Sequence, residues 1–347
     1  MELRLLNVVF SQDNREVRTF PGALPISISR KELPGVAFGY VWSVKADGNR
    51  KFLFIDDTEE KQKWWTLGRD MKTDCVPQLQ HNSVISILDV EVCDDVMYVF
   101  DALMVQNIVT IRKCVLERME IAAAMLTKLP QYQTNWWWDD FEPYMVPTNY
   151  NRSACHLLSG SNMKLVVKPF FVYSSLPKVW PIVSQRLLND GIIFTRIFQK
   201  YESYRSAPLS FIKWKPRELI TIDTVIYNNV DGVSPRVIFQ IPVEFSLRTK
   251  GNVIMCVTRT ATSGVSRSGK KNHREQNMLK DTALAHGNVD GDMFDLINID
   301  GKIGEFSWTG TAWHLLRLRE DKTHSNTLDT ICKTIENLTD VIDFSEL

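Results

Sequence analysis

The stretch VWSVKADGNRKFLFIDD, residues 41–57, places Lys45 one residue away from an Asp-Gly pair. Apolar and aromatic runs flank the pair on both sides. Asp-Gly between strand-like runs is a strong hairpin signal, because glycine tolerates the positive φ that such turns need. The stretch therefore predicts a β-hairpin. By itself it leaves two interpretations of Lys45 open: a solvated charge beside a turn, or an amine placed to attack a substrate.

The composition indicates two globular domains without a strong overall charge. At 347 residues the chain exceeds the usual size of one hydrophobic core. It holds 41 basic and 41 acidic side chains, so no overall field attracts it to nucleic acid or to an anionic membrane. We therefore expect any polyanionic partner to be held by local basic patches.

The cysteines and the hydropathy pattern favour an intracellular protein. The six cysteines are dispersed, with no CxxC pair and no histidine at metal-site spacing, so we expect neither a zinc site nor disulfides. The first residues, MELRLLNVVF, include an acidic second position and no long apolar core, and do not predict a signal peptide. No apolar run approaches the roughly eighteen residues of a membrane span, so we expect no membrane association.

Hydrophobic periodicity outlines the order of elements. Residues 38–101 are mostly strand-like, residues 111–129 fit a helix, and strand-like runs resume from 164 to 214. Short β-runs from residue 218 onward predict a small antiparallel barrel. Apolar residues recur at helical spacing in residues 327–344, which predicts an amphipathic helix whose apolar face must dock on another element.

Two segments allow more than one interpretation. Residues 130–153 predict an irregular excursion, and its three adjacent tryptophans, 136–138, suit either base stacking or the packing of a long loop, with packing favoured. Residues 248–274 carry seven Lys or Arg and no Asp or Glu. That segment is either an RNA-backbone contact or simply a basic loop.

Six short motifs follow the K-x-D-G-x-R stretch in order along the chain. They are LDVEV, YVFDAL, KPFF, NDGIIF, KWKP and RLREDK, with the candidate residues Glu91, Phe100, Lys168, Asp190, Lys213, Lys215, Arg317, Asp321 and Lys322. Each residue also has an ordinary structural interpretation, as a strand-surface charge, a core aromatic, a turn, a strand end or a solvated face. Taken together, those structural interpretations would require a series of coincidences in a fixed order.

These residue types suit one kind of chemistry. A lysine amine attacks only when neutral, and its ordinary pKa near 10.4 leaves it charged. Nearby cations such as Lys213 and Lys215, or a divalent metal, favour the neutral amine and would also neutralise a nucleoside triphosphate during in-line displacement. Carboxylates at Asp190 and Glu91 suit a metal or sugar hydroxyls. Phe100 offers a face on which a purine can stack.

The ordered series resembles the mRNA capping branch of the covalent nucleotidyltransferase superfamily, the GTP:RNA guanylyltransferases, over about residues 20–326. The tryptophan of KWKP and the RLREDK series with Asn326 resemble capping enzymes more than DNA ligases. The resemblance implies an α+β fold. A nucleotidyltransferase domain with ATP-grasp-like antiparallel sheets and helices spans 1–217, an OB-fold β-barrel spans 218–323, and a C-terminal helix, 324–347, packs back on the first domain.

The resemblance also implies a role for each motif residue. Lys45 would become linked to GMP, Arg50 and Glu91 would hold the ribose, Phe100 would stack on guanine, and Lys168 would reach the guanine O6. Lys213 and Lys215 would contact the α-phosphate, Asp190 would help to place Mg²⁺ or Mn²⁺, and Arg317, Asp321 and Lys322 would orient pyrophosphate.

The predicted activity is therefore an mRNA guanylyltransferase that transfers GMP from GTP, through a lysyl-GMP intermediate, to the 5′-diphosphate end of RNA. The alternatives are an ATP-dependent DNA or RNA ligase, and a non-catalytic RNA- or nucleotide-binding module of the same fold. Domain closure and opening predict hinge motion near residues 217–222.

An RNA triphosphatase and a cap methyltransferase are expected on other chains. The expected location is intracellular, either the nucleus of a eukaryotic cell or, for a viral protein, a cytoplasmic factory or virion.

Overall fold

Two compact units make up the chain, Met1–Trp214 with Leu347, and Lys215–Glu346. The computed structural model describes residues 2–10, 17–58, 62–74, 77, 79–133, 136–147, 155–201, 209–227, 236–242, 256–257, 282–288, 301–308, 313–320, 322 and 324–347. The basic segment 248–274 lies outside the described residues except for 256 and 257. The predicted domain limits and the predicted docking of residues 324–347 on the first domain stay predictions.

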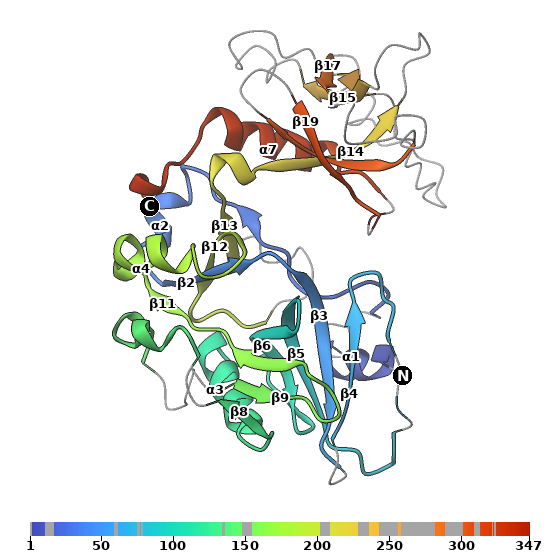
Figure 1. The fold of residues 1–347 in the computed structure, drawn as a ribbon, viewed down its shortest axis with the longest axis vertical. Helices are drawn as coiled ribbons and strands as arrows, with labels where there is room; N and C mark the ends of the chain where they lie inside the picture. The colour runs from blue at the N-terminus through green and yellow to red at the C-terminus, as the bar shows by residue number, and fades with distance from the viewer. Residues whose placement is uncertain are drawn as a thin grey trace. The chain divides into compact units, whose positions relative to one another are not determined.

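The first unit contains a five-stranded sheet in the order β1-β13-β12-β2-β11. Its strands are β1 (Ile26–Ser27), β13 (Phe211–Trp214), β12 (Asn189–Arg196), β2 (Tyr40–Ala46) and β11 (Phe171–Val172). Only the β1–β13 pairing is parallel among them. The strand that carries Lys45 therefore lies beside the strand that carries Asp190 (Figure 1).

A second, larger sheet of the first unit has the order β4-β3-β5-β6-β10-β9-β8, with β7 paired to β6. Its strands are β3 (Asn49–Asp56), β4 (Lys63–Gly68), β5 (Ile85–Cys93), β6 (Val96–Val105), β7 (Ile108–Val109), β8 (Gln131–Gln133), β9 (Cys155–Leu157) and β10 (Lys164–Val167). Successive residues of β3 enter different clusters: Leu53 packs with α3 (Val115–Leu126), and Phe52 packs with α1 (Glu2–Phe10). The sheet is thus buried on both faces in this region.

The predicted hairpin over residues 41–57 is wrong. In the described part of the chain β2 and β3 are not paired, and they belong to different sheets. The Asp-Gly pair connects β2 of the five-stranded sheet to β3 of the larger sheet. Gly48 does not have positive φ. A Cβ at Gly48 would lie 2.5 Å from Val92 O and 2.6 Å from Cys93 Sγ. Glycine is therefore required for the close approach of β5, and not for the conformation of a tight turn.

The helices of the first unit are α1, α2 (Leu33–Val36), α3 and α4 (Leu176–Val183), with 3-10 turns at Asp139–Tyr144 and Tyr173–Ser175. The helix predicted within residues 111–129 is confirmed as α3. Its N-terminus has a capping box in which the Glu117 side chain accepts from the Cys114 backbone N–H at 3.0 Å. Its apolar face packs against β6 in the main core.

The adjacent tryptophans serve packing, as favoured from the sequence. Trp138 is buried, and its ring centroid lies 5.8 Å from that of Tyr98 and 5.0 Å from that of Trp137. Trp137 in turn meets Phe141 at 6.4 Å. Through the contact between Trp138 and Tyr98 of β6, this aromatic cluster packs the segment after β8 against the large sheet.

The second unit is a barrel with a helix attached. Its strands run β14-β18-β19-β17-β15, and a further β14–β15 pairing closes the ring, with β16 added on β15. The bounds are β14 (Thr221–Tyr227), β15 (Arg236–Pro242), β16 (Cys256–Val257), β17 (Thr282–Asn288), β18 (Ile303–Trp308) and β19 (Trp313–Leu318). The predicted barrel is therefore present, although β17 and β19 pair in parallel. Its assignment as an OB-fold stays a prediction.

The C-terminal amphipathic helix is confirmed as α7 (Leu328–Thr339). Thr327 caps it by accepting from the Thr330 backbone N–H at 3.3 Å. Ile331, Ile335 and Leu338 are buried, and the helix contacts β14 and β15.

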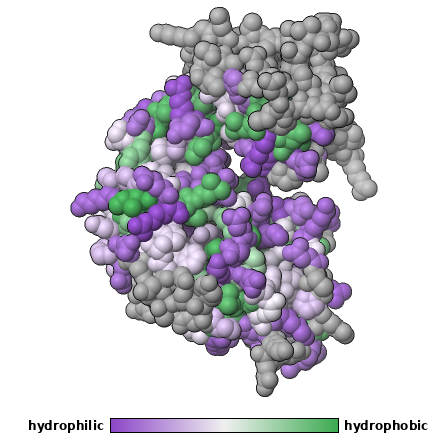
Figure 2. Space-filling view, viewed as in Figure 1, coloured by the Kyte–Doolittle hydropathy of each residue, from purple (hydrophilic) through white to green (hydrophobic). Residues whose placement is uncertain are grey.

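No helix among the described residues is long and apolar enough to cross a membrane. On the face shown in Figure 2, apolar residues of the described part of the chain lie in small groups separated by hydrophilic ones.

Candidate active site

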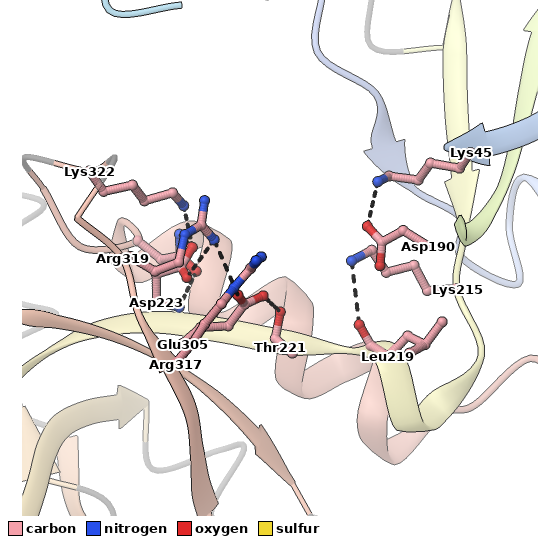
Figure 3. A network of polar contacts seen from close by, with 11 residues as sticks. Lys45, Asp190, Lys215, Leu219, Thr221, Asp223, Glu305, Arg317, Arg319 and Lys322 are labelled. Atoms are coloured by element: carbon pink, nitrogen blue, oxygen red, sulfur yellow. Dashed lines mark hydrogen bonds and ion pairs between the residues drawn. The ribbon is translucent and has the colours of Figure 1, made fainter. Parts of the chain in front are cut away.

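Lys45 and Asp190 form an ion pair between neighbouring strands of the first unit (Figure 3). Lys45 Nζ donates to Asp190 Oδ2, and the two side chains are 22% and 18% exposed. The β12–β2 register shifts between Asn189 and Ile192, and Gly191 has a φ of 117°. This β-bulge directs the Asp190 carboxylate toward the Lys45 amine. The positive φ explains why glycine follows Asp190. The NDG sequence is therefore a bulge and not an ordinary turn.

Lys213 lies on the same sheet face as Lys45. Ser43, Ile193 and Lys213 are side by side in the register of β2, β12 and β13. Side chains at neighbouring register positions point to one face, as do residues two apart in a strand. Lys215 belongs to the second unit, where its Nζ donates to Leu219 O at 3.3 Å.

Four predicted residues gather on the large sheet of the first unit. Two cations lie over the Phe100 ring: its centroid is 5.3 Å from Arg50 Cζ and 5.7 Å from Lys168 Nζ. Burial lowers the pKa of Lys168 to about 8, and the negative charge of Glu91 opposes that shift. Burial raises the pKa of Glu91, opposed by Lys168 and Lys45. The cluster thus combines an aromatic face, a buried amine and a largely buried carboxylate.

Arg50 is held more tightly than the sequence indicated. Its Nε and Nη2 donate to Asp89 Oδ1 and Oδ2 at 2.8 and 2.6 Å, and its Nη1 donates to Ala23 O at 2.5 Å. Phe20 lies 5.5 Å from Arg50 Cζ and contributes a second aromatic face beside Phe100. The bidentate pair and the two rings fix the plane of the guanidinium.

Asp89 and Tyr201 were not predicted as site residues from the sequence. Asp89 is fully buried and accepts a hydrogen bond from Tyr201 Oη at 2.6 Å. The only sequence signal for Asp89 was a carboxylate inside the apolar run ISILDVEV, where an unpaired charge is unfavourable. Tyr201 lies outside the short motifs, and its partner Asp89 is 112 residues away in the chain.

A polar network in the second unit contains the cations of RLREDK (Figure 3). Arg319 Nη1 lies 3.0 Å from Asp223 Oδ1, Lys322 donates to Asp223 Oδ2, and Arg317 Nε lies 2.6 Å from Glu305 Oε2. Burial acts to raise the pKa of Glu305, but hydrogen bonds from Thr221 and Arg317 outweigh it, so the pKa is lowered. Asp321 lies outside the described residues.

Residues 4–217 match the family model described as mRNA capping enzyme, catalytic domain, and residues 239–347 match mRNA capping enzyme, C-terminal domain. The chain belongs to the mRNA capping enzyme family. The mRNA-capping enzyme subunit alpha of Schizosaccharomyces pombe is 23% identical over 361 residues, covering 95% of this chain and 79% of that protein.

Solved DNA ligases are weakly similar. A mycobacterial DNA ligase D complexed with ATP and MES is 14% identical, covers 87% of this chain and 95% of its own, and has a TM-score of 0.39. The Chlorella virus DNA ligase-adenylate is 13% identical, covers 88% of this chain and 99% of its own, and has a TM-score of 0.34.

The family match confirms the predicted fold class, a nucleotidyltransferase domain followed by a capping-enzyme C-terminal domain. It likewise confirms the predicted enzyme class: the chain is an mRNA guanylyltransferase, and GTP is its nucleotide substrate. The matched family does not favour the predicted ligase alternative.

Proposed function

We propose that Lys45 is the nucleophile of this guanylyltransferase, and the Lys45–Asp190 ion pair is the observation that carries the proposal. The pair presents an amine at a partly exposed position, beside a sheet face that also carries Lys213. A neutral lysine amine attacks the α-phosphorus of GTP, the N–P bond forms, and pyrophosphate leaves with the electrons of the P–O bond. The amine releases one proton in this step.

The second step reverses the first at the same phosphorus. A terminal phosphate oxygen of a 5′-diphosphate RNA attacks the bound GMP, the N–P bond breaks, and Lys45 regains a proton as GpppN is released. Lys213 and Lys215 contact the α-phosphate in both steps, where their charges offset that of the in-line transition state.

The buried cluster selects guanine. Lys168 donates to the guanine O6, an acceptor that adenine lacks, while Phe100 stacks on the base. Because Lys168 is only 6% exposed, an adenine bound here would leave its ammonium without the acceptor that guanine O6 supplies. Arg50 and Glu91 bind the ribose hydroxyls.

Asp190 is the proposed carboxylate for Mg²⁺ or Mn²⁺. Among the described residues, no group of three or more His, Cys, Asp or Glu can hold a metal ion. Mg²⁺ commonly uses one or two carboxylates together with substrate phosphates and water, so a site with few protein ligands fits this ion. When bound, the ion supplies positive charge to the triphosphate. It would also compete with Lys45 for the Asp190 carboxylate.

The second unit completes the reaction. Arg317, Asp321 and Lys322 orient pyrophosphate as a leaving group when the barrel closes, and residues 217–222 act as the hinge. Capping also needs an RNA triphosphatase to supply the 5′-diphosphate and a methyltransferase to use the product. The fission yeast relative is named as a subunit, which supports partners on other chains. The proposed location is intracellular, in a nucleus or a viral factory.

Incubation with α-labelled GTP followed by a denaturing gel tests the nucleophile. Wild-type protein should carry the label and Lys45→Ala should carry none. Lys51→Ala is the matched control, because Lys51 lies in the adjacent sheet and faces Asp74 at 3.6 Å. Label retained by Lys45→Ala would refute the assignment, and label from ATP in place of GTP would support a ligase.

A further inference from the structure

We propose that Tyr201 is a positioning residue that orients Asp89 and, through it, sets the guanidinium of Arg50 for binding the nucleotide. Tyr201 lies outside the six short motifs and Lys45's own motif, and it is 4% exposed. The inference rests on the proposed role of Arg50 in holding the ribose.

The hydroxyl of Tyr201 joins the Arg50–Asp89 pair. Tyr201 Oη donates to Asp89 Oδ2 at 2.6 Å, and Arg50 Nη2 lies 3.4 Å from the same hydroxyl. Asp89 Oδ2 therefore accepts from two donors while Oδ1 accepts from Arg50 Nε. A planar guanidinium follows the rotation of the carboxylate that it grips with two hydrogen bonds. The second donor on Oδ2 restricts that rotation, so the tyrosine restricts the direction of the guanidinium.

A second buried ion pair holds the tyrosine itself. Arg118 and Asp101 form two hydrogen bonds of 2.6 and 2.8 Å, and each side chain is 1% exposed. Arg118 Cζ lies 5.7 Å from the centroid of the Tyr201 ring, and Arg118 Nη1 donates to Gln199 O at 3.0 Å. The Tyr201 ring therefore lies against the Arg118 guanidinium while its hydroxyl donates to Asp89. The hydroxyl cannot turn away without breaking these contacts.

The backbone and a neighbouring aromatic fix the position of the ring. Tyr201 N donates to Ile111 O at 2.8 Å, and its ring centroid lies 6.2 Å from that of Phe10 in α1. Burial, and then the charge of Asp89, raise the pKa of Tyr201 well above its ordinary value, so the hydroxyl stays a donor across the working pH range. A phenylalanine would keep the contacts of the ring and lose only the hydroxyl, which donates to Asp89 and accepts from Arg50 Nη2.

The test measures how fast labelled GMP is attached to the protein at graded GTP concentrations. Tyr201→Phe should raise the half-saturating GTP concentration roughly tenfold, as expected for the loss of a hydrogen bond to a charged group, and should change the limiting rate far less. Tyr98→Phe is the matched control: Tyr98 is also buried, and its ring packs on Trp138. The control should show wild-type GTP dependence.

A double-mutant cycle separates positioning from general stability. In an Arg50→Lys or Asp89→Asn background, Tyr201→Phe should have little further effect on the half-saturating concentration, because the interaction that it supports is already lost. An equal effect in all backgrounds, or no effect in the wild-type background, would overturn the inference. If Tyr201→Phe does not fold, the same cycle is run with Tyr201→His, which also removes the hydroxyl, and an equal effect in all backgrounds would again overturn the inference. Failure of the proposed function looks different, because wild-type protein would then form no GMP adduct.

Discussion

Substituting Gly22 by alanine should weaken GTP binding by crowding Arg50. A Cβ at Gly22 would lie 2.5 Å from Arg50 Nη2 and 2.6 Å from Phe20 Cε1. Gly22 does not have positive φ, so the backbone accepts alanine and the effect comes from contact alone. Arg50 cannot retreat, because Asp89 grips it at 2.6 and 2.8 Å and the Phe100 ring lies 5.3 Å from its Cζ.

The magnitude follows from the cost of overpacking. An added methyl in a filled site typically costs about 1–3 kcal/mol. If that cost falls on the position of Arg50, the half-saturating GTP concentration should rise about 5- to 150-fold. The assay is the rate of GMP attachment at graded GTP concentrations, alongside thermal melting to separate local crowding from loss of the fold.

Gly35→Ala is the matched control. Its added Cβ meets nothing within 4 Å, and Gly35 lies in the short helix α2, where alanine is tolerated or slightly stabilising. A folded Gly22→Ala variant with wild-type GTP dependence would refute the reasoning, because it would show that Arg50 does not bind the nucleotide from this position.

Two further predictions concern charge. Lys168 has a folded-state pKa of about 8, against an ordinary value of 10.5. Between these two pH values the unfolded chain binds more protons than the folded chain. The free energy of unfolding should therefore rise with pH in this range. Denaturant titrations at pH 8 and pH 10 should show that rise in wild type and a smaller one in Lys168→Met; equal rises would contradict the assignment. Asp223→Ala should destabilise the second unit by about 1–3 kcal/mol, because Lys322 and Arg319 lose a shared carboxylate. In urea unfolding, the exposed control Glu336→Ala should lower the free energy of unfolding by at most about 0.5 kcal/mol. An equally small loss for Asp223→Ala would count against a stabilising role of the network.

Three of the motif residues approach one another because of strands that the sequence pattern predicted. Glu91, Phe100 and Lys168 lie in or directly after strands that pair in the large sheet, so their approach follows once the strands are recognised. The helix at residues 115–126 was equally accessible, because its periodicity and its capping box are local properties of the sequence. Local patterns thus predicted the helix and the strands, and the ordered series of motifs predicted the fold class through its resemblance to a known family.

The Asp-Gly connection between β2 and β3 shows why other features could not be predicted from the sequence. Turn propensity describes a few residues in isolation, and it could not show that β2 and β3 enter different sheets. The requirement for Gly48 comes from Val92 and Cys93, which lie more than forty residues further along the chain. Tyr201 and Asp89 likewise depend on a contact between distant segments. Such pairs become visible only when the tertiary structure brings the segments together.

The polar network of the second unit would make the proposed binding of pyrophosphate an exchange reaction. Arg317, Arg319 and Lys322 are matched by two carboxylates of the same unit, Asp223 and Glu305. A polyphosphate that binds these cations must displace resident carboxylates, so nearly as many ion pairs are broken as are formed. The binding free energy is then a small difference between similar terms. In the proposed function, Asp223 and Glu305 would return to the cations when pyrophosphate leaves, which favours rapid release over tight retention.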